Sequence, residues 1–147
     1  MAQQDDACSL LDEDHNQAIR LFEQYKTAHE NSRQVILARQ LCHELAVHMQ
    51  IEDEIFYPAF QRATGDTDRV QDSEREHQEA RAIMAKVEQD PLDARTMLEL
   101  EDAILHHVND EREKMFPEAR RTKGFDLERL AGQLTARKAE LMAEHPA

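Results

Sequence analysis

The sequence predicts an all-α protein, an up-down-up-down antiparallel four-helix bundle with an additional C-terminal helix. Two observations support this fold class. The chain of 147 residues contains only three Gly and four Pro, while strong helix formers such as Ala, Leu, Glu and Arg are abundant. In addition, apolar residues recur at the three-and-four spacing of a helix face in five successive segments. We expect one domain over residues 1–147, with the bundle at about 10–120 and the extra helix at about 125–144.

The first two predicted helices each carry polar residues inside an apolar stripe. Apolar residues over 11–25 predict the first helix, and His15 interrupts their stripe. The second helix is expected over about 32–57, and its inward stripe carries His48 and Glu52. Histidine and glutamate on a face that should be buried are candidates for a functional site.

Prolines set the other expected boundaries. Pro58 lacks a backbone donor, so the second helix should kink or end there, before the ATGDTD loop. The third helix should begin near Asp68 and stop before Asp90. Asp90 can cap the fourth helix, with Pro91 in its first turn, and Pro117 marks the far end of that helix.

The remaining helices repeat the pattern of polar residues on an apolar face. His77 interrupts the stripe of the third helix, and His107 and Glu111 lie on the stripe of the fourth. After Gly124 a fifth helix places four leucines on one side: Leu127, Leu130, Leu134 and Leu141. We expect this helix to pack outside the bundle or on a partner chain, which would give a homodimer through the C-terminal helix.

Charge and cysteine content exclude several classes of partner. The formal net charge is -13, with 31 acidic and 18 basic residues, so we expect no nucleic acid and no anionic membrane as partner. The N-terminal segment lacks a basic region followed by an apolar run, and a soluble cytoplasmic protein is expected. Cys8 and Cys42 form no CxxC motif and read as reduced thiols. Any metal site should therefore use nitrogen and oxygen donors.

An internal repeat is the strongest signal in the chain. The segments HMQIEDEIFYP and HHVNDEREKMFP share the pattern HxxxExxxxxP, and the aligned residues are His48 with His107, Glu52 with Glu111 and Pro58 with Pro117. Upstream, LDEDHNQAI and SEREHQEAR repeat an acidic helix start that leads into His15 and His77. The chain therefore contains two copies of one helix hairpin.

The spacing of the repeat places the polar residues at one height. In an antiparallel hairpin, residues equally distant from the turn lie level with each other. With turns near Asn31 and Leu92, all four histidines fall in one layer. Each HxxxE pair lies one helical turn apart, with Cβ atoms about 5–6 Å from each other, so both residues can approach the same centre.

This layer predicts a two-metal site. Buried carboxylates are costly unless they are paired or bind a cation, and imidazole with carboxylate is a ligand set for iron or manganese, with zinc as a weaker alternative. If both glutamates bridge, each ion has four protein donors and room for an oxo or hydroxo bridge and an exogenous ligand. The predicted ligands are His15, His48, Glu52, His77, His107 and Glu111.

At these residues the sequence resembles the hemerythrin-like, or HHE cation-binding, family. The pattern H, HxxxE, H and HxxxE on four successive helices, together with DHNQAIRLF, LAVHMQIEDEIFYPAF, EHQEA and HHVNDEREKMFP, covers roughly residues 10–120. The resemblance implies a non-haem di-iron centre with two iron ions (Fe2+/Fe3+) in a four-helix bundle. Relatives use such centres for reversible dioxygen binding, oxygen or iron sensing, nitric-oxide handling or iron holding.

The third helix departs from the oxygen-carrying members of that family. Those members carry a second histidine one turn before the third-helix ligand, and here that position is Ser73. Glu74 could supply a carboxylate instead, and Asp12 stands in the same relation to His15, although both also suit a helix start as surface or capping acids. An oxygen-rich centre should autoxidise faster, which argues against stable oxygen carriage.

We therefore expect a binding or sensing protein for dioxygen or a related small ligand such as nitric oxide or peroxide, rather than an enzyme. The alternatives are an enzyme with peroxidase-like, catalase-like or nitric-oxide-reducing activity, iron storage, or an interaction module that uses the metal as a staple. Tyr25 and Tyr57 either border the metal pocket or serve packing. The other histidines, His29, His43, His106 and His145, are expected to be solvated or to lie behind the ligands.

Overall fold

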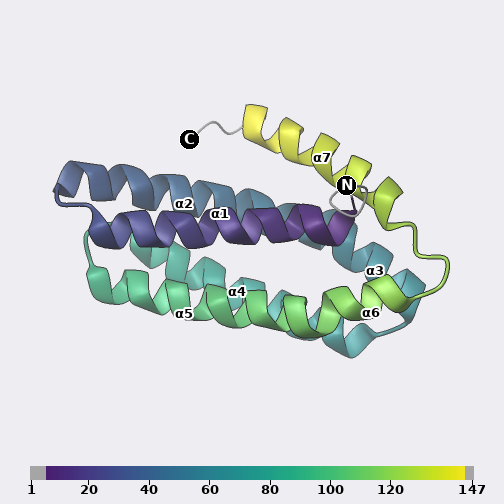
Figure 1. Ribbon diagram of the computed structural model, residues 1–147. Coiled ribbons are helices and arrows are strands. Elements are labelled where there is room, and N and C mark those ends of the chain that lie inside the picture. Colours follow the sequence, from purple (N-terminus) through teal and green to yellow (C-terminus); the bar gives the residue numbers. More distant parts are fainter. Residues whose placement is uncertain (1–5, 145–147) are drawn as a thin grey trace.

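Two helix hairpins form the body of the molecule (Figure 1). The computed structural model describes residues 6–144. In the first hairpin α1 (Ala7–Thr27) lies beside α2 (Asn31–Ile51), and in the second α4 (Thr67–Gln89) lies beside α5 (Ala94–Asp110). The predicted all-α class and the helical bundle are confirmed, and the up-down-up-down order of the helices stays a prediction.

A π-helical segment continues the second helix of each hairpin. Segment η2 (Glu52–Phe56) leads from α2 into α3 (Tyr57–Thr64), and η3 (Glu111–Met115) leads from α5 into α6 (Phe116–Arg121). Both segments begin at the glutamate of an HxxxE pair. Single π turns inside α-helices are rare and are frequent at functional sites. The internal repeat therefore extends to the backbone around the two glutamates.

The helices continue past both prolines, so the helix end expected at Pro117 is wrong, whereas a kink at Pro58 stays a prediction. Pro58 lies in the first turn of α3, and the helix runs on to Thr64. The wider π turn shifts the hydrogen bonding, so that the Tyr57 N–H donates to the Glu52 carbonyl just before the proline. A proline that follows such a turn is accommodated without ending the helix. Pro117 follows η3 in the same way, and its helix ends only at Arg121.

The start of the fourth long helix also differs from expectation. Asp93, not Asp90, caps α5, and its carboxylate accepts a hydrogen bond from the Arg95 N–H at 3.1 Å. Pro91 precedes the helix and lies in the turn, because the Asp90 N–H still closes α4 on the Lys86 carbonyl at 3.1 Å. The end of the third helix before Asp90 was predicted correctly.

The C-terminal helix α7 (Leu127–Glu144) packs on its own chain. It lies along the first hairpin and contacts α1, α2 and η2 (Figure 1). Its four leucines are buried in an apolar cluster with Val47 and Ile51 of α2. The expected packing outside the bundle is therefore what the structure shows, and a homodimer through this helix stays a prediction.

Two apolar clusters enclose a buried polar layer. One cluster includes Phe22, Leu41 and Leu100 and lies towards the hairpin turns. The other includes Phe56 and Phe60 and reaches α3, α6 and α7. The polar layer between them is shielded from water on both sides.

Both cysteines are free and buried. Burial raises the pKa of the Cys8 and Cys42 thiols to about 12, so these groups stay protonated and poorly reactive. Among the helices of residues 6–144, none combines the length and apolar character that crossing a bilayer requires.

The packing of α7 predicts a clear stability difference between two leucine variants. Leu134 is 0% exposed, so Leu134→Ala should leave a cavity and lower the free energy of unfolding by about 2–5 kcal/mol. Leu98, which is 53% exposed, is the matched control, and its change to alanine should cost much less. Urea unfolding followed by circular dichroism measures both. Equal effects would contradict the docking of α7.

Candidate metal centre

The six predicted site residues all lie in the buried polar layer. Each of these residues is at most 5% exposed although the layer contains four imidazoles and two carboxylates. His15 comes from α1 and His77 from α4, and the other residues come from the junctions of α2 with η2 and of α5 with η3. Helices far apart in sequence thus bring the whole predicted set together.

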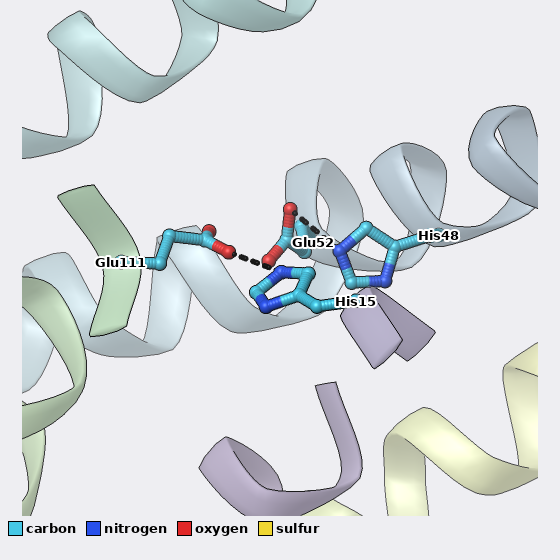
Figure 2. Close-up of side chains that lie close together, drawn as sticks. All are labelled: His15, His48, Glu52 and Glu111. Atoms are coloured by element: carbon cyan, nitrogen blue, oxygen red, sulfur yellow. Dashed lines mark ion pairs between the residues drawn. The ribbon is translucent and has the colours of Figure 1, made fainter. Parts of the chain in front are cut away.

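The first donor group contains two histidines and two glutamates (Figure 2). One ligand atom of each of His15, His48, Glu52 and Glu111 lies within 4.8 Å of the others. The Nε2 atom of His15 is 2.8 Å from Oε1 of Glu111, and Nε2 of His48 is 3.4 Å from Oε1 of Glu52. Figure 2 shows all four side chains pointing toward one another.

The second donor group shares the glutamates with the first. Oε1 of Glu52 lies 3.0 Å from Nε2 of His77 and 3.5 Å from Nε2 of His107. Glu111 directs its two oxygens apart, with Oε1 toward His15 and Oε2 at 3.3 Å from Nε2 of His107. Both glutamates therefore stand between the groups, where a carboxylate could bridge two cations.

Tyr57 reaches the middle of the second group. Its hydroxyl donates its one proton to Oε2 of Glu111 at 2.7 Å, and the hydroxyl oxygen also lies 3.1 Å from Oε1 of Glu52 and 3.1 Å and 3.2 Å from Nε2 of His77 and His107. Burial and the two carboxylates hold the pKa of Tyr57 well above its usual range. The sequence had left packing and a place beside the metal pocket equally open for this tyrosine.

The internal repeat shows one residue by which the two donor groups differ. It aligns Tyr57 with Phe116, whose ring stacks on His15 at a centroid distance of 5.9 Å. Phenylalanine brings no oxygen to the first group, whereas Tyr57 brings one to the second. The two groups are therefore chemically unequal.

On the outer side of the layer, a carboxylate contacts the Nδ1 atom of each of the four imidazoles. Each Nδ1 atom lies 2.6–2.9 Å from a carboxylate oxygen, in the pairs His15–Asp12, His48–Asp14, His77–Asp53 and His107–Glu76. A carboxylate at Nδ1 favours a proton there and leaves Nε2 facing inward with its lone pair, which is the arrangement of metal-binding histidines. Sequence reasoning missed Asp14, Asp53 and Glu76, although the repeated acid directly before His15 and His77 was a visible signal.

The two extra acids considered from the sequence have different places. Asp12 lies behind His15 and accepts from Arg112 at 2.6 Å, so it positions the imidazole from the outer side of the layer. Ser73 is buried. Glu74, which follows it, is exposed and does not supply the carboxylate considered for this position. The additional oxygen near the second group belongs to Tyr57 instead.

The unpaired atoms of the first group fit a bound cation. Within residues 6–144 four of its inward atoms have no hydrogen-bond partner: Nε2 of His15, Nε2 of His48, Oε2 of Glu52 and Oε1 of Glu111. His15 and Glu111 are close, yet their geometry is not that of a hydrogen bond. A buried polar atom without a partner costs about 1–3 kcal/mol, and a cation would satisfy all four. The donor set therefore suits a metal ion.

The carboxylates also determine the charge of the imidazoles. Burial lowers the pKa of His48, but Glu52 and Asp14 outweigh it and raise the pKa to about 10. The same opposition raises the pKa of His15, His77 and His107. Protons and metal ions thus compete for the same inward nitrogens.

Two surface pockets approach the first group. One, of about 360 Å³, is lined by residues of α1, α2 and α7 that include Asp14, His48 and Lys138. The other, of about 720 Å³, includes Asp12 and Phe116 in its lining. Small molecules can therefore come close to the group although its donors are almost completely buried.

Comparisons with known proteins agree with this geometry. The sequence model of the hemerythrin HHE cation-binding domain matches residues 6–119. This chain belongs to the hemerythrin HHE family. Domains of the family bind metal cations, and the buried histidines and glutamates of this HHE domain are groups that could hold them.

One solved structure has the same fold as this HHE domain. It is the crystal structure of a hemerythrin HHE cation-binding domain-containing protein from Mycobacterium kansasii, described as a homologue of Rv2633c. The sequences are 22% identical, and the match covers 95% of this chain and 88% of that chain with a TM-score of 0.80. A search among curated proteins gives no match. Helix α7 lies beyond the residues that the family model covers.

The charged pairs of the layer predict how the stability of the metal-free protein depends on pH. The hydrogen bond with His15 lowers the pKa of Asp12 to about 2, so its stabilising effect is complete above about pH 4 and is lost as the pH falls further. The pKa of His48 is raised to about 10, so its contribution is complete below about pH 6.5 and is lost as the pH rises.

Thermal unfolding of chelator-treated protein should therefore show highest stability between about pH 4 and 6.5. In His48→Gln the loss of stability between about pH 6.5 and 10 should become smaller. An unchanged alkaline profile in this variant would show that the His48 pairs do not stabilise the fold.

Proposed function

We propose that this protein binds two iron ions in the two donor groups and takes up dioxygen or a related small ligand there. The observation that carries the proposal is the pair of shared carboxylates. Glu52 and Glu111 are 0% exposed and lie between two sets of inward imidazole nitrogens. Buried carboxylates of this kind are stable when cations neutralise them.

The donor types are compatible with iron. Each ion would have two imidazoles and two carboxylate oxygens, a mixed set that suits iron and manganese and, less well, zinc. All of the proposed ligands are nitrogen and oxygen donors, and both thiols lie outside the groups. Iron joined by an oxo or hydroxo bridge would supply reversible redox chemistry and a coordination position for an exogenous ligand.

The surroundings of the site support binding of small ligands. Phe56 and Phe116 form an aromatic wall on one side of the layer, with ring centroids 5.8 Å apart, and His15 stacks on Phe116. The buried layer excludes bulk water, while the two surface pockets end at residues that touch its histidines. A molecule the size of dioxygen or nitric oxide suits such a site better than a large substrate.

Removal of one ligand should lower the metal content. The protein loaded anaerobically with Fe2+ should contain two irons per chain, and His107→Ala should contain one or fewer because the second group loses a nitrogen donor. His29 is exposed and lies in the turn between α1 and α2, so His29→Ala is the control and should keep both ions. Iron analysis by inductively coupled plasma spectrometry measures the ratio. A stably folded wild type without iron after loading would rule out the proposal.

Tyr57 is proposed to give its oxygen to the ion in the second group. A bound cation would oppose the carboxylates and lower the pKa of the phenol, as metals do for coordinated groups. Oxidised iron-loaded protein should then show a phenolate-to-iron absorption band that Tyr57→Phe lacks.

The chain offers a matched tyrosine control for this test. Tyr25 donates to the Pro91 carbonyl at 2.7 Å near the hairpin turns, away from the polar layer. Tyr25→Phe should keep the band. If Tyr57→Phe has the same visible and resonance Raman spectrum as the wild type, Tyr57 serves only as a hydrogen-bond donor.

Tyr57 also supports a second candidate function, an enzyme with peroxidase-like, catalase-like or nitric-oxide-reducing turnover. Its O–H group is directed into the second group, where it donates to Glu111 at 2.7 Å, so it would be a proton donor for a substrate bound there. Sustained peroxide consumption by the iron-loaded protein, beyond one equivalent per centre, would favour this alternative over ligand binding.

A further inference from the structure

One acid of the internal repeat has different partners in the two hairpins. Asp14 and Glu76 are aligned by the repeat, and each accepts from the Nδ1 atom of the histidine on the second helix of its hairpin. The other oxygen of Asp14 contacts the ammonium group of Lys138 at 2.6 Å. Helix α7 thus supplies a cation that neutralises the carboxylate behind His48.

Glu76 has no equivalent of Lys138. Its Oε1 atom lies 2.6 Å from Nδ1 of His107, while its Oε2 atom lies 3.3 Å from Nε2 of His106. Across the part of the chain that the structure describes, no lysine or arginine pairs with Glu76. The carboxylate behind His107 therefore lacks the permanent cation that its counterpart has.

On the second hairpin, donor residues occupy the positions that correspond to those covered by α7 on the first hairpin. The repeat aligns Val47 with His106 and Ile51 with Asp110. Val47 and Ile51 are buried in the apolar cluster that contains the α7 leucines. On the second hairpin the same face is open, with the His106 side chain 69% exposed. Apolar residues under a helix are thus replaced by a histidine and a carboxylate at the surface.

The spacing of these donors suits a divalent cation. One atom of each of Glu76, His106 and Asp110 lies within 4.8 Å of the others. Nε2 of His106 is 3.3 Å from the Glu76 carboxylate and 3.4 Å from the Asp110 carboxylate. Donors about 2.0–2.2 Å from one ion, at angles near 90–110°, are about 2.8–3.6 Å apart. Both measured separations fall in this range.

The electrostatic surroundings favour a cation as well. A surface groove of about 550 Å³ between α4 and α5 includes Glu76 and His106 in its lining, together with three further acids and no lysine or arginine: Glu79, Glu99 and Asp102. Such a groove raises the local concentration of cations. Lys114 approaches the other oxygen of Asp110 at 3.7 Å from an exposed position, so it leaves the Glu76 side of the cluster open.

We propose that Glu76, His106 and Asp110 bind a third divalent transition-metal ion at the surface. This ion has the role that Lys138 has in the first hairpin. It neutralises Glu76 and keeps that carboxylate hydrogen-bonded to Nδ1 of His107. The surface site stands without the proposed function, whereas its effect on His107 rests on it.

The site itself is tested with Mn2+ as the probe. Iron-loaded protein is titrated with Mn2+, and free Mn2+ is followed by electron paramagnetic resonance. The wild type and the control His29→Ala should each bind one Mn2+ per chain. His106→Ala and Asp110→Asn should bind it about tenfold or more weakly. A wild type that binds no Mn2+, or variants that bind it as tightly as the wild type, would overturn the proposal.

The same titration separates this proposal from the proposed function. If the buried groups take up no iron, binding of one Mn2+ that is lost in His106→Ala still supports the surface site. If the buried groups take up two irons and His106→Ala changes no Mn2+ binding, the surface site is wrong while the proposed function stands.

The effect on His107 is tested with a permanent cation. His106→Lys places an ammonium group beside Glu76 and removes the imidazole ligand, so it should lose Mn2+ binding but keep the absorption spectrum of the iron centre in the wild type saturated with Mn2+. His106→Ala should lose Mn2+ binding and shift that spectrum. If both variants show the wild-type spectrum, the surface ion does not position Glu76.

Discussion

Neutralisation of two buried carboxylates is the constraint on which the rest of the structure depends. Glu52 and Glu111 have no access to water, and a bare carboxylate in such surroundings would lose several kcal/mol of hydration. Four inward imidazoles, each held by a carboxylate at Nδ1, surround the pair. The apolar clusters on both sides keep water out. The fold thus concentrates polar groups where only protons or cations can balance them.

A duplicated hairpin supplies this arrangement, and a few substitutions make its halves unequal. Tyr57 brings a hydroxyl to the second group where Phe116 brings only a ring to the first. Asp53 contacts His77 directly, whereas the aligned Arg112 reaches His15 only through Asp12. Two ions held by such groups would differ in ligand charge and in hydrogen bonding. The two donor groups are therefore chemically unequal, although they come from one repeated hairpin.

Helix α7 connects the exterior of the bundle to this layer. Its leucines cover the face of α2 that carries Val47 and Ile51, while Lys138 contacts the carboxylate that holds His48. A change in the packing of this helix would therefore affect His48, a donor of the first group. Within residues 6–144 no helix covers the second hairpin in this way, and His106 is exposed there instead.

The sequence by itself determined the all-α class, the repeated hairpin and the six inward residues, because helical periodicity and repeat spacing depend only on the order of residues. Local rules failed at Pro117 and Asp90, where a π turn and a later cap set the helix boundaries. The hydroxyl position of Tyr57 and the acids behind the histidines depend on how the helices are rotated against each other. Only tertiary packing decides that rotation, since one apolar stripe allows several.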